Sequence, residues 1–179
     1  MIIKNEKKLR EKITETWSFE SPPIDIDEFV TELIDTMWEH SGLGISANQL
    51  GYSYRVFAMR GATKDESIIC FNPEIKDFSP ELNTMEEGCL SLPDVFARVV
   101  RPAHVAISYL DQDGKEEGQL ASGMTARVFQ HELDHLDGIL FVDRLSKLSR
   151  ERAFEKARKI KKFRARGKEK YQRQTKFTL

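Results

Sequence analysis

The residues His131-Glu132-Leu133-Asp134-His135 form an HExxH sequence, the strongest chemical signal in the chain. Within a helix, two histidines four positions apart project from one face, about one turn from each other, so both imidazoles can reach the same metal ion. Glu132 lies beside them and can take a proton from a water molecule on that metal. We therefore expect a helical metal site with His131 and His135 as ligands and Glu132 as an acid–base group.

The third ligand decides what type of site this is, because a catalytic metal usually has three protein ligands and one open position. The longer pattern HExxHxxGxxH has its glycine at Gly138, but Phe141 replaces its last histidine, which excludes that pattern. Glu155 is a candidate, as a glutamate on a downstream helix, although Lys and Arg surround it. Cys89 is another, because a thiolate with two imidazoles suits Fe(II), Co(II), Ni(II) or Zn(II).

The composition predicts one folded domain with a real core, since 40% of the 179 residues are hydrophobic and 32% are charged. Disorder and a disulfide framework are excluded as classes. The opening MIIKNEKKLR lacks the apolar run of a signal peptide, and no run of about 18 apolar residues follows. We expect a cytoplasmic location, or an organelle stroma or matrix if a transit peptide was removed. Cys70 and Cys89 should then be free thiols, with Cys70 in the core.

The HExxH helix is predicted over residues 123–137 and should end at Gly138. It has two occupied faces. One is an apolar stripe, made by Ala126, Phe129, Leu133 and Leu136. The other carries Met124, Val128, His131 and His135 at positions i, i+4, i+7 and i+11. Such a helix should lie between the core and a pocket.

The other predicted elements surround this helix. Asp25 and Glu28 have the form of a capping box before an amphipathic helix, which Gly42 and Gly44 should end. Short apolar runs predict antiparallel strands at 54–59, 68–71, 95–100 and 105–110. Because no helix-length segment separates them, a parallel βαβ sheet is disfavoured. The expected class is α+β, with antiparallel sheets around a central HExxH-bearing helix, an N-terminal amphipathic helix and a C-terminal basic helix.

The net charge of −1 conceals a strong asymmetry. Segment 144–176 carries 15 Lys and Arg and three Glu, a net charge of +12, whereas the rest of the chain carries −13. A helix is predicted from near Ser149 with a narrow apolar stripe, and it should fray beyond about Arg164. Clustered cations are attracted to nucleic-acid phosphate, so we predict contact with ribosomal RNA, and neither DNA nor a membrane as a partner. The alternative is a solvated helix that balances the acidic body.

Three segments resemble the ordered motifs of peptide deformylases. They are GLGISANQ at 42–49, EGCLS at 87–91 and QHELDH at 130–135, and the resemblance covers roughly residues 25–145. One departure is Ser46, where the family usually has alanine; its hydroxyl needs a hydrogen-bond partner. The resemblance implies a hydrolase of protein biosynthesis that removes the N-formyl group from the initiator formyl-methionine of newly made polypeptides.

The same resemblance implies roles for individual residues. The metal ligands would be Cys89, His131 and His135, with Fe(II) as the native metal and Zn(II), Ni(II) or Co(II) as possible replacements. Glu132 would transfer the proton. The side-chain amide of Gln49 and the N–H of Leu90 would hold the oxyanion that forms from the formyl group.

Substrate contacts are expected from Leu43, Gly44, Met124 and Val128. The glycine lets an extended peptide backbone approach closely. Met124 and Val128, which share the helix face of the histidines, are candidates for an apolar pocket around the methionine side chain.

Glu87 is also assigned to the substrate-binding cleft. Its alternative role is that of a structural anion near Arg98 or Arg101, and the head group of Arg127 is a further candidate partner. We favour the structural role of Glu87 over any catalytic one.

We expect residues 1–145 to form the metal-dependent deformylase catalytic domain and residues 146–179 to form a basic C-terminal helix and tail, within the same domain or appended to it. Two other functions stay open. One is an HExxH metallopeptidase with Glu155 as third ligand, and the other is an RNA- or ribosome-binding module with a structural metal.

Overall fold

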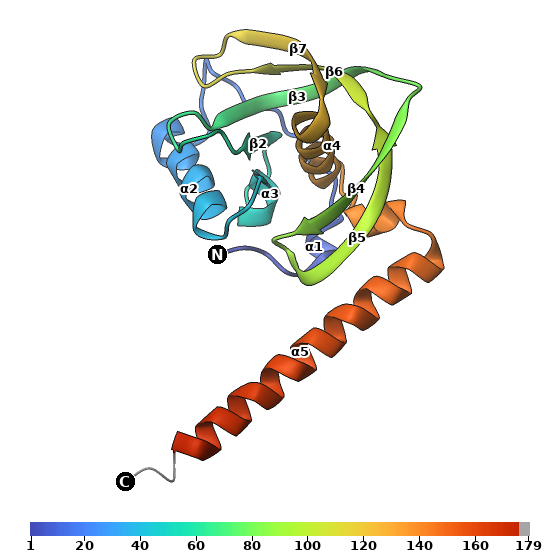
Figure 1. Cartoon of the computed structure of the whole chain (residues 1–179). Coiled ribbons are helices and arrows are strands. Elements are labelled where there is room, and N and C mark those ends of the chain that lie inside the picture. The colour runs from blue at the N-terminus through green and yellow to red at the C-terminus, as the bar shows by residue number, and fades with distance from the viewer. Residues whose placement is uncertain (176–179) are drawn as a thin grey trace.

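The computed structural model describes the backbone of residues 1–175 and the side chains of residues 1–166. Two antiparallel β-sheets surround one helix, α4 (Gly123–Leu136), as Figure 1 shows. The larger sheet has the strand order β1-β2-β3-β6-β7, and the smaller one pairs β4 with β5. The strands are β1 (Gly44–Ser46), β2 (Val56–Met59), β3 (Ile68–Phe78), β4 (Leu82–Cys89), β5 (Leu92–Pro102), β6 (His104–Leu110) and β7 (Glu116–Ser122). The predicted α+β class is confirmed.

The strand predictions are right where apolar residues concentrate and incomplete elsewhere. Three of the four predicted runs lie wholly within strands, namely β3, β5 and β6, and the fourth, 54–59, contains β2, which begins at Val56. β3 is longer than predicted, because it continues beyond Pro73 through an irregularity in its pairing with β6 at which Asn72 has a φ of 49°. The short strand β1 and the polar strands β4 and β7 were not predicted; their sequences have little of the β-branched and aromatic content that marks strands.

Helix α2 (Ile26–Glu39) begins as predicted, since the Asp25 side chain accepts a hydrogen bond from the Glu28 N–H at 2.9 Å. It ends differently. Ser41, with a φ of 56°, takes the left-handed position, and the Gly42 N–H donates to the Met37 carbonyl at 2.8 Å. This pattern is that of a Schellman motif, which ends the helix before either predicted glycine. The apolar face of α2 packs on β1 and β2, where Phe29, Leu33 and Met37 are buried.

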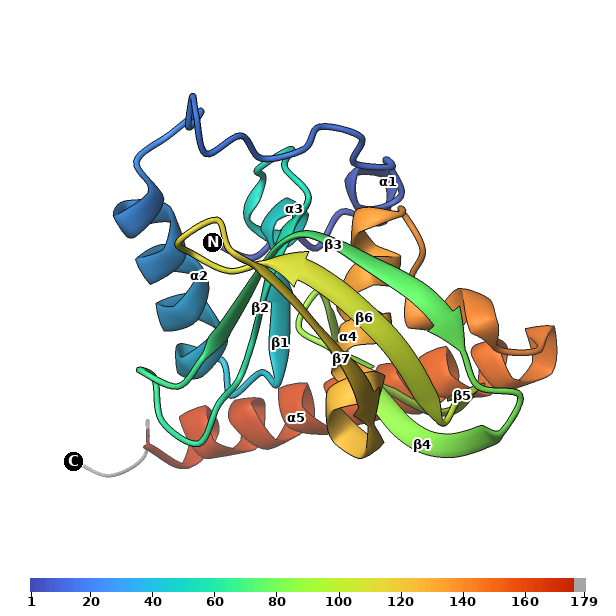
Figure 2. The same cartoon turned by 90° about the horizontal axis from the view of Figure 1, so that it is seen from above.

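The chain before α2 contains the one-turn helix α1 (Glu6–Leu9) and then crosses the molecule to α2, as Figure 2 shows. Its backbone is held along the way. The Ile13 N–H donates to the Leu136 carbonyl at 2.8 Å, and the Trp17 N–H donates to Asn72 Oδ1 at 2.7 Å. These bonds attach the N-terminal chain to the C-terminal end of α4 and to the irregular part of β3.

Helix α4 ends close to the predicted position, with Gly138 at a φ of 74° just beyond its cap. Its apolar stripe packs into the core under the large sheet, where Ala126, Phe129 and Leu136 are buried and Leu133 is partly buried. Its second face meets the β4–β5 pair, since His131 contacts Glu87 and His135 contacts Cys89, and Met124, Val128 and His131 of this face line a cleft. The predicted position between core and pocket is therefore confirmed.

After α4 comes a single 3-10 turn, η1 (Phe141–Arg144), and then the long helix α5 (Lys147–Thr175). Ala153 and Ala157 of α5 are buried in a cluster that also contains Leu92 and Val95 of β5. The helix continues beyond Arg164, where we predicted fraying, because Lys, Arg, Glu and Gln have high helix propensity. Residues 176–179 of the predicted tail lie outside the described residues.

In the described part of the chain, none of the helices combines the length and the apolar character that a membrane crossing requires.

Candidate metal centre

Three side chains meet where α4 faces the β4–β5 pair. His131 and His135 lie one turn apart on α4, with ring centroids 5.0 Å from each other. Cys89 ends β4 at a break in register, and its Sγ lies 3.2 Å from His135 Nε2. One ligand atom from each of the three lies within 4.8 Å of the other two. Two imidazoles and one thiol at this spacing can coordinate a divalent transition metal and leave a position open.

Hydrogen bonding gives the His131 ring a defined orientation. Its Nδ1 lies 2.9 Å from Glu87 Oε2, so the carboxylate accepts the Nδ1–H and Nε2 is available to a metal. The face of the ring stacks on Phe141 of η1, with centroids 5.9 Å apart and planes 27° apart. His131 is thus held at one nitrogen and at one face.

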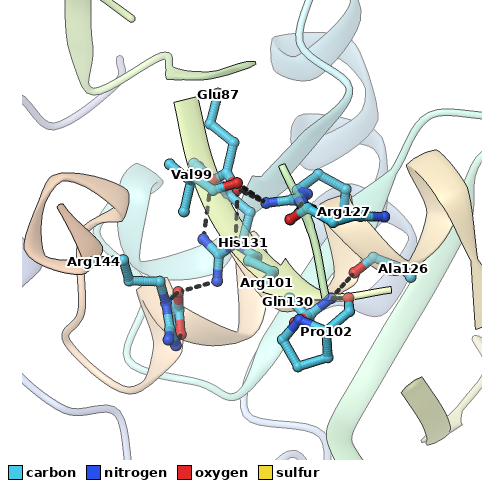
Figure 3. A network of polar contacts seen from close by, with 11 residues as sticks. Glu87, Val99, Arg101, Pro102, Ala126, Arg127, Gln130, His131 and Arg144 are labelled. Atoms are coloured by element: carbon cyan, nitrogen blue, oxygen red, sulfur yellow. Dashed lines mark hydrogen bonds and ion pairs between the residues drawn. The ribbon is translucent and has the colours of Figure 1, made fainter. Parts of the chain in front are cut away.

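Glu87 is buried and surrounded by cations, as Figure 3 shows. Arg101 donates to both of its oxygens at 2.7 and 2.9 Å, and Arg127 donates to Oε1 at 2.7 Å. Although burial alone would raise the pKa of Glu87, the Arg101 and His131 hydrogen bonds hold it well below its usual value. These contacts correspond to the alternative role of Glu87 as a structural anion. Its partners are Arg101, rather than Arg98, and Arg127.

The electrostatics of the cluster favour a thiolate. Burial raises the pKa of the Cys89 thiol, but the neighbouring His135 and His131 outweigh it and hold that pKa well below its usual value. Burial lowers the pKa of His131, but hydrogen bonds to Cys89 and Glu87 raise it to about 10. A metal ion would replace these protons, because its ligands must be a thiolate and neutral imidazoles.

Glu132 lies beside the cluster in a buried position, and its Oε2 has no hydrogen-bond partner among the described residues. Burial raises the pKa of its carboxyl to about 7, although the two histidines act in the opposite direction. A carboxyl group with such a pKa can both accept and return a proton near neutrality.

Gln49 approaches the cluster from the short helix α3 (Ala47–Leu50). Its Oε1 accepts from the backbone N–H of Ser46 at 3.0 Å and from the Ser46 hydroxyl at 3.1 Å. Its Nε2 therefore points the other way, toward the Ser91 hydroxyl at 2.9 Å and Cys89 Sγ at 3.5 Å. The hydroxyl of Ser46, the departure from the family pattern, thus has its partner in Gln49.

A cleft of about 690 Å³ opens over these residues. Most of the predicted site residues line it, namely Leu43, Gly44, Gln49, Glu87, Cys89, Leu90, Met124, Val128, His131 and Glu132. Leu43 and Met124 are about half exposed on its rim. The Glu87 oxygens, by contrast, are occupied by the arginines and His131. Cys70 lies apart from the cleft in the core, as predicted.

Glu155 does not approach the cleft. Its side chain is exposed on α5 and pairs with Lys159 at 2.7 Å. Among the described residues, the cluster with metal-ligand geometry consists of Cys89, His131 and His135.

The partners of Asp134 were not found from the sequence. Arg101, which the sequence offered only as a candidate partner of Glu87, sits in a strand yet is 1% exposed, and it also donates to Asp134 at 2.6 Å. Asp134 in turn accepts from Arg144 of η1. The acidic Asp134 inside the HExxH segment was the available signal, because an anion on a buried helix requires a cationic partner.

Comparison with known proteins gives one consistent family. A sequence model described as polypeptide deformylase matches residues 1–151. A peptide deformylase of Maricaulis maris is 43% identical over 141 residues, covering 77% of this chain and 81% of the relative. A crystal structure of a peptide deformylase from Legionella pneumophila superposes with a TM-score of 0.81 at 34% identity, covering 93% of this chain and 97% of that one. A Met-Ala-Ser-bound peptide deformylase from Acinetobacter baumannii gives a TM-score of 0.73 at 33% identity, with 81% and 97% covered.

Proposed function

The chain belongs to the polypeptide deformylase family and removes the N-formyl group of new polypeptides, and we propose that it does so with Cys89, His131 and His135 as ligands of one divalent metal ion. The observation that carries this assignment is the convergence of one sulfur and two imidazole nitrogens within 4.8 Å. The available Nε2 of His131 and the depressed pKa of the Cys89 thiol support it. Bound there, such an ion would make a water molecule nucleophilic at neutral pH and polarise the formyl carbonyl.

Fe(II) is the proposed native metal, and Zn(II), Ni(II) or Co(II) the proposed replacements. A donor set of one thiolate and two imidazoles suits all four and disfavours Mg²⁺ and Ca²⁺.

Glu132 is the proposed proton carrier. Its partnerless Oε2 is free to accept a proton from the attacking water and then to deliver it to the amine that leaves as the new N-terminus. The raised pKa of about 7 supports both steps, since the carboxyl can exist in either protonation state near neutrality.

Gln49 and Leu90 are the proposed oxyanion donors. Because both Ser46 donors hold Gln49 Oε1, the Nε2 end of the amide is directed into the cluster before any substrate arrives. Leu90 follows Cys89 directly and lines the same cleft, which supports its backbone N–H as the second donor. Each such donor is typically worth about 3 kcal/mol in the transition state.

The proposed substrate is an extended formyl-methionyl peptide. β1 stands at the edge of the large sheet, where Gly44 and the N–H of Leu43 can offer backbone groups to an added strand, whereas the Leu43 carbonyl accepts from the Arg60 N–H at 2.9 Å. Met124 and Val128 are the proposed walls of the methionine pocket. The Acinetobacter relative binds Met-Ala-Ser in its crystal structure, a peptide with the free methionine that deformylation would leave, and this supports the same class of product here.

We assign residues 1–145 to the catalytic domain and 146–179 to a basic C-terminal helix and tail. Ala153 and Ala157 support the packing of the first turns of α5 on the body, since both are buried in one cluster with residues of β5. Segment 144–176, which contains α5, carries the net charge of +12, and this supports contact with ribosomal RNA. The proposed compartment is the cytoplasm, or an organelle matrix or stroma, because formylated chains are made there.

The function is tested by release of formate from formyl-Met-Ala-Ser, with acetyl-Met-Ala-Ser as control. The protein is loaded with Fe(II) without oxygen, and separately with Zn(II). We expect formyl-specific hydrolysis, faster with Fe(II). Absence of formyl-specific release in both preparations would contradict the function, whereas equal rates with the two metals would contradict only the choice of Fe(II).

The ligand set is tested by substituting Cys89 and Glu155 separately with alanine and measuring bound metal. We expect loss of metal on changing Cys89 and full retention on changing Glu155. The opposite result would favour a metallopeptidase-type site.

A further inference from the structure

We propose that Arg144 is a positioning residue that fixes the imidazole of His131 through three intervening side chains. They are Asp134, Arg101 and Glu87, which belong to one series of ion pairs. Figure 3 labels Arg144, Arg101, Glu87 and His131 of this series. The inference rests on the proposed function in one respect, namely that His131 binds the metal. It assigns a role in that function to a residue which lies in η1, outside the cleft.

The inner half of the series is rigid. Arg101 holds both oxygens of Glu87 with a two-pronged contact, at 2.7 and 2.9 Å, which fixes the plane of the carboxylate. The Oε2 in that plane accepts from His131 Nδ1 at 2.9 Å. Because Arg101 and Glu87 are both buried, water does not compete for these bonds. The direction of the His131 ring therefore depends on where Arg101 lies.

The outer half of the series decides that position. Arg101 Nη1 donates to Asp134 Oδ2 at 2.6 Å, and Arg144 Nε donates to the same oxygen at 2.6 Å. A second N–H of Arg144 donates to Asp134 Oδ1. Asp134 is thus a buried carboxylate between two guanidinium groups, and the Arg144 side chain, 40% exposed, is its outermost partner.

Removal of Arg144 would leave this carboxylate without a partner at Oδ1. A buried charge that loses a partner reorients or draws in water, because the unpaired state is costly. Either response changes the contact between Asp134 and Arg101, and with it the carboxylate that orients His131. Substitution of a residue that orients a metal ligand in this way typically lowers metal affinity by about 10- to 100-fold.

The same 3-10 turn holds His131 a second time. Phe141, three residues before Arg144, stacks on the His131 ring. Asp143 of this turn also binds Arg10 beside α1 and Arg150 in α5. η1 therefore acts on His131 at two points, through Phe141 at the ring face and through Arg144 at the outer end of the series of ion pairs.

The test compares full-length variants Arg144→Gln, Arg144→Lys and Arg150→Gln. Arg150 is a matched control, because its side chain is also 40% exposed and pairs with a carboxylate of η1, Asp143, at 3.3 Å, outside the series. The probe is Co(II) alone. Its dissociation constant is measured by competition with a chelator, and its visible spectrum reports the geometry of the ligands.

We expect Arg144→Gln to weaken Co(II) binding about tenfold and to shift the Co(II) absorption bands, with Arg144→Lys between it and the unsubstituted protein. Arg150→Gln should match the unsubstituted protein. Melting temperatures of the metal-free variants distinguish a general loss of stability from a change at the metal site. A general loss of stability would leave the spectrum of the bound metal unchanged.

An Arg144→Gln protein with the Co(II) affinity and spectrum of Arg150→Gln would overturn the proposal. If Arg144→Gln does not fold, Arg144→Lys is judged by the same comparison. Failure of the unsubstituted protein to bind Co(II), or full binding by His131→Ala, would instead contradict the proposed ligand set, so the two failures are distinguishable.

Discussion

A Cβ atom on Gly44 would lie 2.5 Å from Oε1 of Glu132, so β1 can pack on α4 at this point only with a glycine. Val128 Cγ1 closes the same space at 2.8 Å. The sequence suggested that this glycine admits the substrate backbone. The structure gives it another purpose, since the absence of a side chain at Gly44 sets where the carboxylate of Glu132 lies.

Gly44→Ala should therefore lower kcat, by about 10²-fold, because a shift of about 1 Å in a reacting group can cost that much. The measurement is the rate of formate release with bound metal determined in parallel. Gly118→Ala is the control, since a Cβ there would meet no atom nearer than 3.3 Å. Equal activity of the two variants would show that Glu132 does not depend on this packing.

Glu132→Gln should keep the metal and lose activity by about 10²- to 10⁴-fold, the usual contribution of a positioned proton carrier. The substitution preserves the shape of the side chain and removes only its ability to accept a proton. Metal content is measured by elemental analysis beside the rate of formate release. Retention of more than a tenth of the activity with metal bound would contradict the assigned role.

The three long helices and the two histidine ligands were predictable because their signals are local. The two faces of α4 follow from the 3.6-residue period, and the HExxH spacing puts His131 and His135 on one of them. Cys89 is different. Its spacing from His131 says nothing of proximity. Its chemistry made it a candidate ligand, and resemblance to a known family selected it over Glu155; the structure then places it beside His135.

The surroundings of the ligands were not predictable, since they depend on tertiary contacts. Arg101 occupies a strand position that turns inward, where sequence patterns lead one to expect an apolar side chain. Arg144 reaches Asp134 only because η1 folds back along α4. The left-handed Ser41 at the end of α2 is similar, because the two glycines that follow are the stronger local signal.

Asp143 should make stability depend on pH. Burial raises the pKa of its carboxyl, but hydrogen bonds from Arg10 and the Leu140 N–H outweigh this and lower the pKa below 3.8. A lowered pKa contributes stability above the unfolded-state value, and this contribution is lost as the pH falls through the folded-state value. Asp143→Asn should therefore cost about 1–2 kcal/mol at pH 7 and progressively less below about pH 4. Urea unfolding at pH 7 and pH 3 measures both differences; a cost that does not change with pH would contradict the role of the charge.

Ending the chain after Lys161 should weaken ribosome binding at low salt and leave turnover of short formyl peptides nearly unchanged. The truncation removes seven Lys and Arg and one Glu, whereas the buried Ala153 and Ala157 remain to hold α5 on the body. Since each phosphate contact releases counterions, binding of the full chain should fall steeply between about 50 and 200 mM salt, and binding of the truncated chain less so.

Two double variants test whether the location of the charge matters. Arg158→Gln with Lys162→Gln removes two cations from α5, and Lys7→Gln with Lys8→Gln removes two from α1. In cosedimentation with ribosomes, the double variant in α5 should bind more weakly than the double variant in α1. Equal binding by the truncated and full chains would exclude α5 as the contact.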